Sequence, residues 1–276
     1  MRLTPKTLIA GLAATAVLAV APVAGAGTLN TGGSTGMQVL ASALAQNYTH
    51  NAANKDHARF TVSGGGSGAG ITGANAGTFV IGNSSRAPKS SDAKGLQFWP
   101  ISVEPFVVIV NPRNKVSTLT KDQIKGIFTG AITNWKSVGG SDCAIKGYTR
   151  ITGSGTLDTF RTLFLDNATV SSSFRALGSN GLDRSAVAGD ACAVSFVTFA
   201  YTVGTTAVKA LAVSGVAPSL ANVKAQKYAY AGYQYFVTKG TPTGAVANYI
   251  NWARSSAAAS IISKYALPTT AAVVTT

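Results

Sequence analysis

Short apolar runs rich in β-branched and aromatic residues alternate along this chain with segments whose apolar residues recur at helical spacing. The strand-like runs are residues 59–63, 78–81, 106–110, 193–197 and 235–238. The clearest helical segments are residues 37–44, 157–164 and 243–265. This alternation predicts an α/β fold with largely parallel sheets.

Two helix starts are marked by hydroxyl side chains. Residues 120–123 (Thr-Lys-Asp-Gln) match a capping box, and residues 153–156 (Gly-Ser-Gly-Thr) place hydroxyls just before the helical spacing that starts at Leu157. A hydroxyl at this position accepts a hydrogen bond from a free backbone N–H of the first turn. Both segments therefore predict a helix immediately downstream.

Three loops combine glycine with Ser or Thr: residues 32–36, 64–70 and 153–156. Each can follow a strand and precede a helix, so that free backbone N–H groups and hydroxyls would face one anion from several directions. One such loop is ordinarily only a turn. Three of them, with Arg150 just before the third, indicate an anion site.

The first 26 residues have the pattern of a signal peptide. Arg2 and Lys6 precede the uncharged segment 8–20, and residues 24–26 (Ala-Gly-Ala) supply a small-residue cleavage pattern. No cysteine stands at that point to carry a lipid anchor. We therefore expect an exported protein, periplasmic or extracellular, that is soluble after cleavage behind Ala26.

The net charge of the chain indicates which class of partner it binds. The 276 residues carry 23 Lys and Arg against 9 Asp and Glu, a net charge of +14, so partners should be anionic. The basic residues are scattered singly, without the basic run or aromatic-lined stripe that a nucleic-acid groove uses. Nucleic acid is therefore not an expected partner, and we expect a monomer.

Cys143 and Cys192 are the two cysteines of the chain. In an exported protein a disulfide between them is favoured over two separate buried thiols. Two cysteines alone do not form a tetrahedral metal site, and no metal or other cofactor is expected.

Two catalytic motifs overlap the glycine loops. Residues 32–36 fit the G-x-S-x-G nucleophile elbow with Ser34 as nucleophile. A hydrolase of that kind needs a histidine well downstream, whereas His50 and His57 follow the serine closely within a polar stretch. Serine hydrolysis is therefore disfavoured.

Residues 68–73 fit the dinucleotide pattern G-x-G-x-x-G, and Asp92 follows at a suitable distance. Residues 74–78, however, are expected to break up rather than continue as the helix that such a site requires. A dinucleotide site is disfavoured for this reason.

Several short motifs, in their family order, resemble the phosphate-binding proteins of bacterial phosphate ABC transporters. The matching segments are residues 33–36, 64–71, 81–86, 106–112, 119–135, 150–160 and 208–223. The resemblance implies the two-lobed periplasmic binding protein fold with the ligand in the interlobe cleft. Residues 27–104 and 230–276 would form lobe 1, and residues 105–229 lobe 2.

The resemblance also implies a ligand set for phosphate. From lobe 1 it comprises Thr35, Gly36, Ser67 and Ser85, and from lobe 2 Arg150, Ser154, Gly155 and Thr156. Many neutral donors around one guanidinium suit an anion that must later be released.

The chain departs from one form of the family pattern at two positions. Ser85 stands where some members have an aspartate that accepts the phosphate proton, so the acceptor here is left open. Thr152 replaces an aspartate that orients the arginine in some relatives, so Arg150 is expected to be held differently. Arg86 is interpreted as a surface or lobe-bracing arginine rather than as a ligand.

The function implied is extracytoplasmic capture of inorganic phosphate for delivery to an ABC permease, without catalysis. The alternatives are binding of another oxyanion, a secreted phosphate scavenger without a permease and, from another class, an exported hydrolase or phosphatase. Most phosphatases use a metal or a histidine base, and the sequence indicates neither.

Overall fold

The computed structural model describes residues 27–269 and 274–275. The predicted signal peptide, residues 1–26, lies outside the described residues. Among the helices that are described, none is both long and apolar enough to cross a bilayer.

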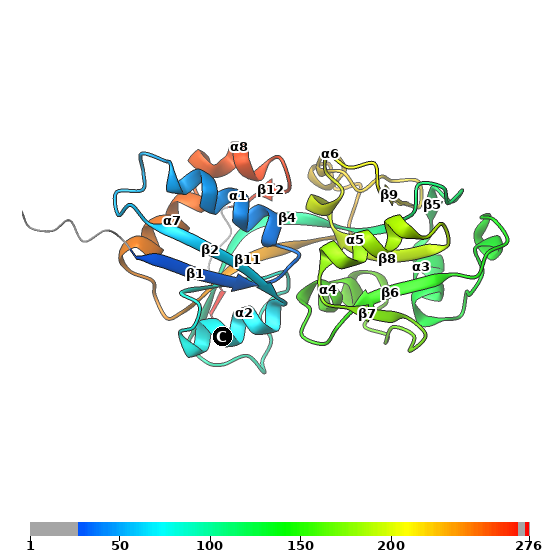
Figure 1. Ribbon diagram of the computed structural model, residues 1–276, viewed down its shortest axis with the longest axis horizontal. Helices are drawn as coiled ribbons and strands as arrows, with labels where there is room; N and C mark the ends of the chain where they lie inside the picture. Colours follow the sequence, from blue (N-terminus) through cyan, green and yellow to red (C-terminus); the bar gives the residue numbers. More distant parts are fainter. Residues whose placement is uncertain (1–26, 270–273, 276) are drawn as a thin grey trace, which may run out of the picture.

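One long, curled sheet runs through the molecule (Figure 1). Its strands, in spatial order, are β2 (Arg59–Gly65), β1 (Thr28–Gly33), β3 (Ile81–Ser84), β11 (Ala231–Lys239), β4 (Leu96–Val110), β8 (Ala193–Thr198), β6 (Lys146–Arg150) and β7 (Arg175–Leu177). Three short strands also pair with β4: β9 (Lys209–Ala210), β12 (Leu267–Pro268) and β13 (Val274–Thr275). A separate two-stranded sheet joins β5 (Thr118–Leu119) to β10 (Ala212–Val213).

The sheet is mixed, which corrects the expectation of largely parallel pairing. Parallel pairs lie toward its two ends, where β1 pairs with β2 and β3, and β6 pairs with β7 and β8. The middle is antiparallel, because β11 runs against both β3 and β4, and β4 runs against β8. The chain leaves the first half along β4 and returns along β11, so these two strands point in opposite directions.

Strand β4 changes partner halfway along its length. Its first part pairs with β11 as far as Pro105 opposite Ala231, and its second part pairs with β8 from Phe106 onward. Figure 1 shows two groups of elements side by side, with β4 and β11 passing between them. We call the group with β1, β2, β3 and β11 lobe 1, and the group with β6, β7 and β8 lobe 2.

Helices cover the sheet in both lobes. Lobe 1 carries α1 (Gln38–Thr49), α2 (Ser67–Ala76), α7 (Gly244–Ala253) and α8 (Ala259–Ile262). Lobe 2 carries α3 (Lys121–Thr129), α4 (Gly155–Phe164), α5 (Asn180–Gly189) and α6 (Leu220–Lys224). Short 3-10 helices cover Trp135–Val138, Phe199–Tyr201 and Ser256–Ala258.

Each lobe has its own aromatic core. In lobe 1, Tyr48 of α1 packs against Tyr249 and Trp252 of α7, with ring centroids 5.2 and 5.0 Å away. In lobe 2, Phe160 of α4 stacks on Phe196 of β8 at 3.9 Å. Burial of such side chains contributes about 1.5–3 kcal/mol each. Two cores of this kind allow the lobes to hold their shapes separately.

Most of the predicted elements are present, with three corrections. The long helix predicted over residues 243–265 is wrong, because Ser255 caps a new turn through the N–H of Ala257 and divides the segment. The strand predicted at residues 78–81 begins only at Ile81, since Thr78 donates to the carbonyl of Gly73 instead of joining the sheet. The expected break over residues 74–78 is also wrong at its start: α2 continues to Ala76 and ends on left-handed Gly77.

Candidate anion site

The three glycine-hydroxyl loops meet where helices of the two lobes begin. Thr35 and Gly36 lie just before α1, Ser67 is the first residue of α2, and Ser154 is the N-cap of α4. Helix α5 begins at the same place, because the backbone N–H of Asn180 donates to Thr35 Oγ1 at 3.3 Å. Four helix starts thus surround one point, where the helix dipoles favour an anion.

All the predicted ligand side chains are buried there. Thr35, Ser67, Ser85, Arg150, Ser154 and Thr156 are each less than 5% exposed. The lobes touch directly around them, since Arg150 Nη2 of lobe 2 donates to Thr35 Oγ1 of lobe 1 at 3.1 Å. A second direct contact joins the backbone N–H of Gly68 to the carbonyl of Gly153 at 2.9 Å. The structure therefore brings the whole predicted set together at the interface of the lobes.

Two glycines leave the room that this arrangement needs. A Cβ added to Gly36 would lie 2.7 Å from Thr156 Oγ1 and 2.8 Å from Ser85 Oγ. A Cβ added to Gly155 would lie 2.1 Å from Ser67 Oγ and 2.7 Å from Ser67 Cβ. Hydroxyls of both lobes therefore lie against Gly36, the Ser67 hydroxyl of lobe 1 lies against Gly155, and only glycine fits at either position.

Arg150, the last residue of β6, supplies the buried positive charge. Its Nε donates to the carbonyl of Leu177 at 3.1 Å, and its Nη2 donates to that of Gly178 at 2.9 Å. Its Nη1 has no hydrogen-bond partner among the described residues, although it is buried. Burial lowers the pKa of Arg150, and Asp183 opposes this shift. A guanidinium stays protonated in proteins, so Nη1 has two N–H groups to offer an anion.

Asp183 of α5 holds Arg150 in place. The resemblance gave this role to an aspartate that Thr152 replaces in this chain. Asp183 Oδ2 lies 3.2 Å from Arg150 Nε, and both side chains are almost fully buried. Burial raises the pKa of Asp183 to about 8, with the guanidinium and the Ser195 hydroxyl opposing the rise. This role of Asp183 could not be predicted from the sequence, because one acidic residue in an amphipathic helix gives no sign that it faces inward.

Asn180 was missed as well, and it ties three parts of the site together. Its Nδ2 lies 3.1 Å from Thr35 Oγ1 and 3.2 Å from Thr156 Oγ1. Its Oδ1 accepts from the backbone N–H of Thr198 at 3.2 Å. The hydroxyls of Thr35 and Thr156 are thereby held as acceptors toward Asn180, with their hydrogens free to turn toward a ligand.

Ser85 connects Ser67 to a buried residue of β11. Its backbone N–H donates to Ser67 Oγ at 3.0 Å, and its own hydroxyl donates to Gln234 Oε1 at 2.5 Å. The hydroxyl of Ser34 lies 2.5 Å from that of Ser85. Gln234 is completely buried, and its role could not be predicted from the sequence, because a single polar residue between Tyr233 and Tyr235 is ordinary in a strand.

Arg86 lies beside the site as a brace. It makes a paired contact with Asp92 of lobe 1, 2.7 Å at its shortest, and its Nε lies 3.5 Å from Asp158 of lobe 2. Asp158 also accepts from Lys89 at 2.6 Å. This ion-pair group joins the lobes at the edge of the site, which agrees with the second of the two roles considered for Arg86, a surface or a lobe-bracing arginine.

The two catalytic motifs lack their required surroundings. The hydroxyl of Ser34 contacts Ser85 and the N–H of Met37, and no histidine is among its hydrogen-bond partners in the described part of the chain. Gly68 already lies inside α2, whereas a dinucleotide site needs its first glycine in the turn before the helix. Within residues 27–269, no group of three or more His, Cys, Asp or Glu side chains is placed to hold a metal.

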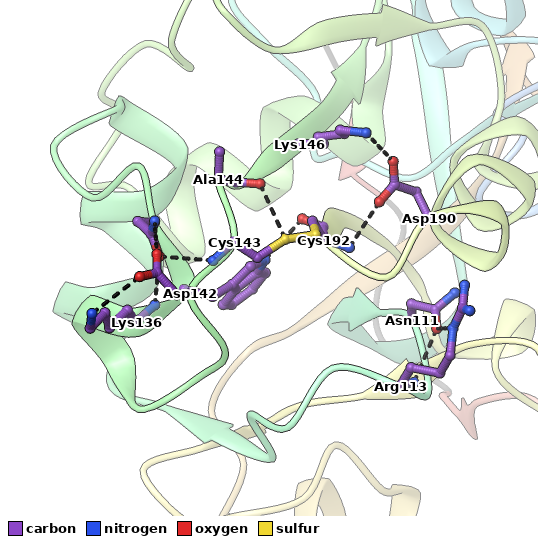
Figure 2. Close-up of a disulfide and its surroundings, with 11 residues drawn as sticks. Asn111, Arg113, Lys136, Asp142, Cys143, Ala144, Lys146, Asp190 and Cys192 are labelled. Carbon is purple, nitrogen blue, oxygen red and sulfur yellow. Dashed lines mark hydrogen bonds and ion pairs between the residues drawn. A yellow bond between two sulfur atoms is a disulfide. The ribbon is translucent and has the colours of Figure 1, made fainter.

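The predicted disulfide is present at the other end of lobe 2. Cys143 and Cys192 are bonded, with their Cα atoms 6.1 Å apart (Figure 2). Figure 2 also shows Lys146 paired with Asp190, and Lys136 with Asp142, on either side of the bond. The bond ties the loop before β6 to the residue before β8, whereas Arg150 and Thr198 lie at the far ends of these strands.

The chain is similar to known proteins over most of its length. Residues 19–257 match the model of the PBP superfamily domain. The chain is 33% identical to the phosphate-binding protein PstS of Bacillus subtilis, over 83% of this chain and 76% of that protein.

Solved structures agree with this match. A substrate-binding protein of a phosphate ABC transporter from Clostridium perfringens, solved with bound phosphate, superposes with a TM-score of 0.81 at 28% identity, covering 88% of this chain and all of that one. An ABC-type phosphate transport receptor from Vibrio cholerae superposes with a TM-score of 0.69 at 26% identity, covering 87% and 100%. The chain therefore belongs to the PBP superfamily and, within it, to the family of the phosphate-binding protein PstS.

Proposed function

We propose that this protein binds inorganic phosphate between its two lobes and delivers it to the permease of an ABC transporter, without converting it chemically. The observation that carries the proposal is the buried meeting point of four helix starts, into which Arg150 brings a guanidinium nitrogen that lacks a partner among the described residues. Such a point offers hydrogen-bond donors and positive potential to a small, dehydrated oxyanion.

The proposed ligands are those that the resemblance implies: Thr35, Gly36, Ser67, Ser85, Arg150, Ser154, Gly155 and Thr156. One guanidinium among neutral donors balances tight capture against later release, because each further full charge would slow dissociation. The proposal includes the limits of the lobes, residues 27–104 with 230–276 for lobe 1 and 105–229 for lobe 2. The change of partner along β4 between Pro105 and Phe106 supports these limits.

Phosphate is favoured over other oxyanions by the relatives. The Bacillus protein is named a phosphate-binding protein, and the Clostridium structure holds bound phosphate. The partner permease, the monomeric state and export by the predicted signal peptide are part of the same proposal. Binding of phosphate outside the cytoplasm is useful to a cell when a permease receives the ligand.

Calorimetric titration and thermal unfolding of phosphate-stripped protein test the proposal. Phosphate at 100 times its Kd should stabilise the fold by about 2.7 kcal/mol, which raises Tm by about 5–10 °C. Arg150→Ala should weaken binding by more than about 100-fold, since it removes the only guanidinium of the proposed ligand set. Phosphoesters should not be hydrolysed.

Asp166→Asn is the control, because among the described residues Asp166 forms its ion pairs with Lys121 and Lys125, on the surface of lobe 2. No heat and no rise in Tm at millimolar phosphate would contradict phosphate binding. Release of phosphate from a phosphoester would contradict the absence of catalysis.

A further inference from the structure

The hydrogen-bond chain behind Ser85 has a fixed direction. Gln234 Oε1 is an amide oxygen, which only accepts, so the single hydrogen of the Ser85 hydroxyl is used in that bond at 2.5 Å. The Ser34 hydroxyl, 2.5 Å from Ser85 Oγ, must then be the donor between the two serines. Ser34 therefore donates to Ser85, and Ser85 donates to Gln234.

This direction determines what the two serines offer to a ligand. With their hydrogens used inside the chain, Ser34 Oγ and Ser85 Oγ present only lone pairs. The Ser34 oxygen accepts from the backbone N–H of Met37 at 3.3 Å. The Ser85 oxygen lies beside Gly36, where an added Cβ would be 2.8 Å away. Ser85 is thus an acceptor among groups that otherwise donate.

We propose that Gln234 is the positioning residue that makes Ser85 an acceptor, and that this selects oxyanions carrying a proton over those that carry none. The proposal rests on the proposed function, because it takes Ser85 as part of the phosphate site. Near neutral pH phosphate and arsenate keep an O–H group, whereas sulfate and selenate have none. An acceptor that faces an unprotonated oxygen loses its hydrogen bond and is left buried without a partner.

Gln234 is suited to this role by its burial and by its hydrogen bond to Ser85. Its side chain is fully buried, and Oε1 has the Ser85 hydroxyl as its hydrogen-bond partner. Its Cα pairs with that of Ser102 on β4, whose buried hydroxyl has no hydrogen-bond partner among the described residues. Ser102 thus lies next to Gln234 without joining the chain of hydroxyls, which makes it a matched control.

The test measures the Kd of four anions by calorimetry on the phosphate-stripped full chain. The wild-type protein should favour phosphate over sulfate, and arsenate over selenate, by about tenfold or more, because both pairs differ in the same proton. Gln234→Leu removes the acceptor and lets the serine hydroxyls turn and donate. Both ratios should fall about tenfold, and sulfate should bind more tightly than it does to the wild type.

Tighter sulfate binding separates this role from a merely structural one, since general damage to the site would weaken both anions together. Gln234→Glu keeps an acceptor oxygen, so it should preserve the ratios while weakening both anions through its negative charge. Ser102→Ala should leave the ratios unchanged. If Gln234→Leu does not fold, the wild-type ratios for the two anion pairs and the Gln234→Glu ratios decide the question.

Wild-type protein that binds phosphate tightly but sulfate equally well overturns the inference. It is also overturned if the ratios survive in Gln234→Leu, or if they collapse in Gln234→Glu. Equal binding of phosphate and sulfate by the wild-type protein would mean that the amide nitrogen of Gln234 donates to Ser85, so that the hydrogen bonds run in the opposite direction. Failure of the wild-type protein to bind phosphate at all is a different result, because it overturns the proposed function itself.

Discussion

Gly155 is the first residue of α4, and it faces Ser67 of lobe 1 with no room for a side chain. Gly155→Ala should abolish detectable phosphate binding, because its Cβ would lie 2.1 Å from Ser67 Oγ and hold the lobes apart. The fold of each lobe should persist, since alanine suits the first turn of a helix. Titration calorimetry and circular dichroism measure the two effects.

Gly189→Ala is the control for this prediction. Gly189 ends α5, and a Cβ added there would meet no atom within 4 Å. Its affinity for phosphate should equal that of the wild type. Unchanged binding in Gly155→Ala would show that the lobes close differently around the ligand.

Glu104 is a fully buried carboxyl in β4, close to where this strand changes partner. Its Oε1 accepts from the backbone N–H of Ala200 at 2.8 Å, and burial raises its pKa to about 8. Between its ordinary pKa near 4.5 and this value, the folded protein keeps a proton that the unfolded chain has released. Stability therefore falls as the pH rises through this window. Asp183 is shifted in the same direction and adds to the fall.

Glu104→Gln keeps the acceptor for Ala200 and cannot ionise. We expect its Tm to exceed that of the wild type by a margin that grows from pH 5 to pH 8, while the contribution of Asp183 remains in both proteins. Scanning calorimetry at three pH values measures the margin, and Asp142→Asn, at an exposed surface carboxylate, should show no such growth. A margin that is constant with pH would mean that Glu104 does not carry the proton.

At the scale of single elements, two helix caps separate stability from binding. Thr120 caps α3 by accepting from the N–H of Gln123 at 3.1 Å, and Ser154 caps α4 by accepting from that of Leu157 at 3.2 Å. Replacing either by alanine should cost about 1 kcal/mol of stability, or about 2–4 °C in Tm. Only Ser154→Ala should also weaken phosphate binding, since only its hydroxyl lies in the proposed site.

The same two variants serve as each other's controls, measured by thermal unfolding without ligand and by titration with phosphate. Equal phosphate affinities in Thr120→Ala and Ser154→Ala would remove Ser154 from the ligand set. A larger stability loss in Ser154→Ala alone would instead show that its cap supports the contact between the lobes.

The elements that the sequence predicted well are those with local signals. The capping box at Thr120 and the hydroxyls before Leu157 determine where α3 and α4 begin, whatever packs against them. The first half of β4 was missed because it contains Pro100 and Pro105, which ordinarily argue against a strand. Its pairing with β11, more than a hundred residues away, overrides that local preference.

The candidate site also contains residues with and without a local signal. Its glycine and hydroxyl loops could be predicted from the sequence, because helix starts need those residue types. The roles of three further residues could not be predicted: Asp183, Asn180 and Gln234. Each is a polar residue that becomes functional only when the fold buries it against a distant segment. Ser85 and Gln234, for example, lie so far apart in the sequence that no local pattern predicts their contact.

At the scale of the whole molecule, Asp158 joins the lobes through Arg86 and Lys89. Partly exposed ion pairs contribute about 0–1 kcal/mol, so Asp158→Asn should weaken phosphate binding only about two- to fivefold. The ligand-free protein should also become more open, which small-angle scattering detects as a larger radius of gyration. Asp166→Asn should change neither quantity, and an equal effect in both variants would refute a role in closure.

The disulfide restrains lobe 2 as a whole. Cys143 and Cys192 are 49 residues apart, and a crosslink of this span contributes about 4 kcal/mol by restricting the unfolded chain. Replacing both with serine should lower Tm by about 8–16 °C. Phosphate affinity should change little, because the bond and the proposed site lie at opposite ends of β6 and β8. Calorimetry measures both, and a large loss of affinity would show that the bond positions the site.

The place of β11 in the sheet determines the order in which the two lobes can fold during synthesis. Lobe 2 is made from one uninterrupted stretch of chain, whereas β11 lies between β3 and β4 although it comes more than a hundred residues later. During synthesis lobe 2 can assemble its core as soon as its own stretch has emerged. The segments of lobe 1 must wait, with apolar surface uncovered, until β11 and α7 arrive. We therefore expect the part of the chain that is made first to complete its fold last.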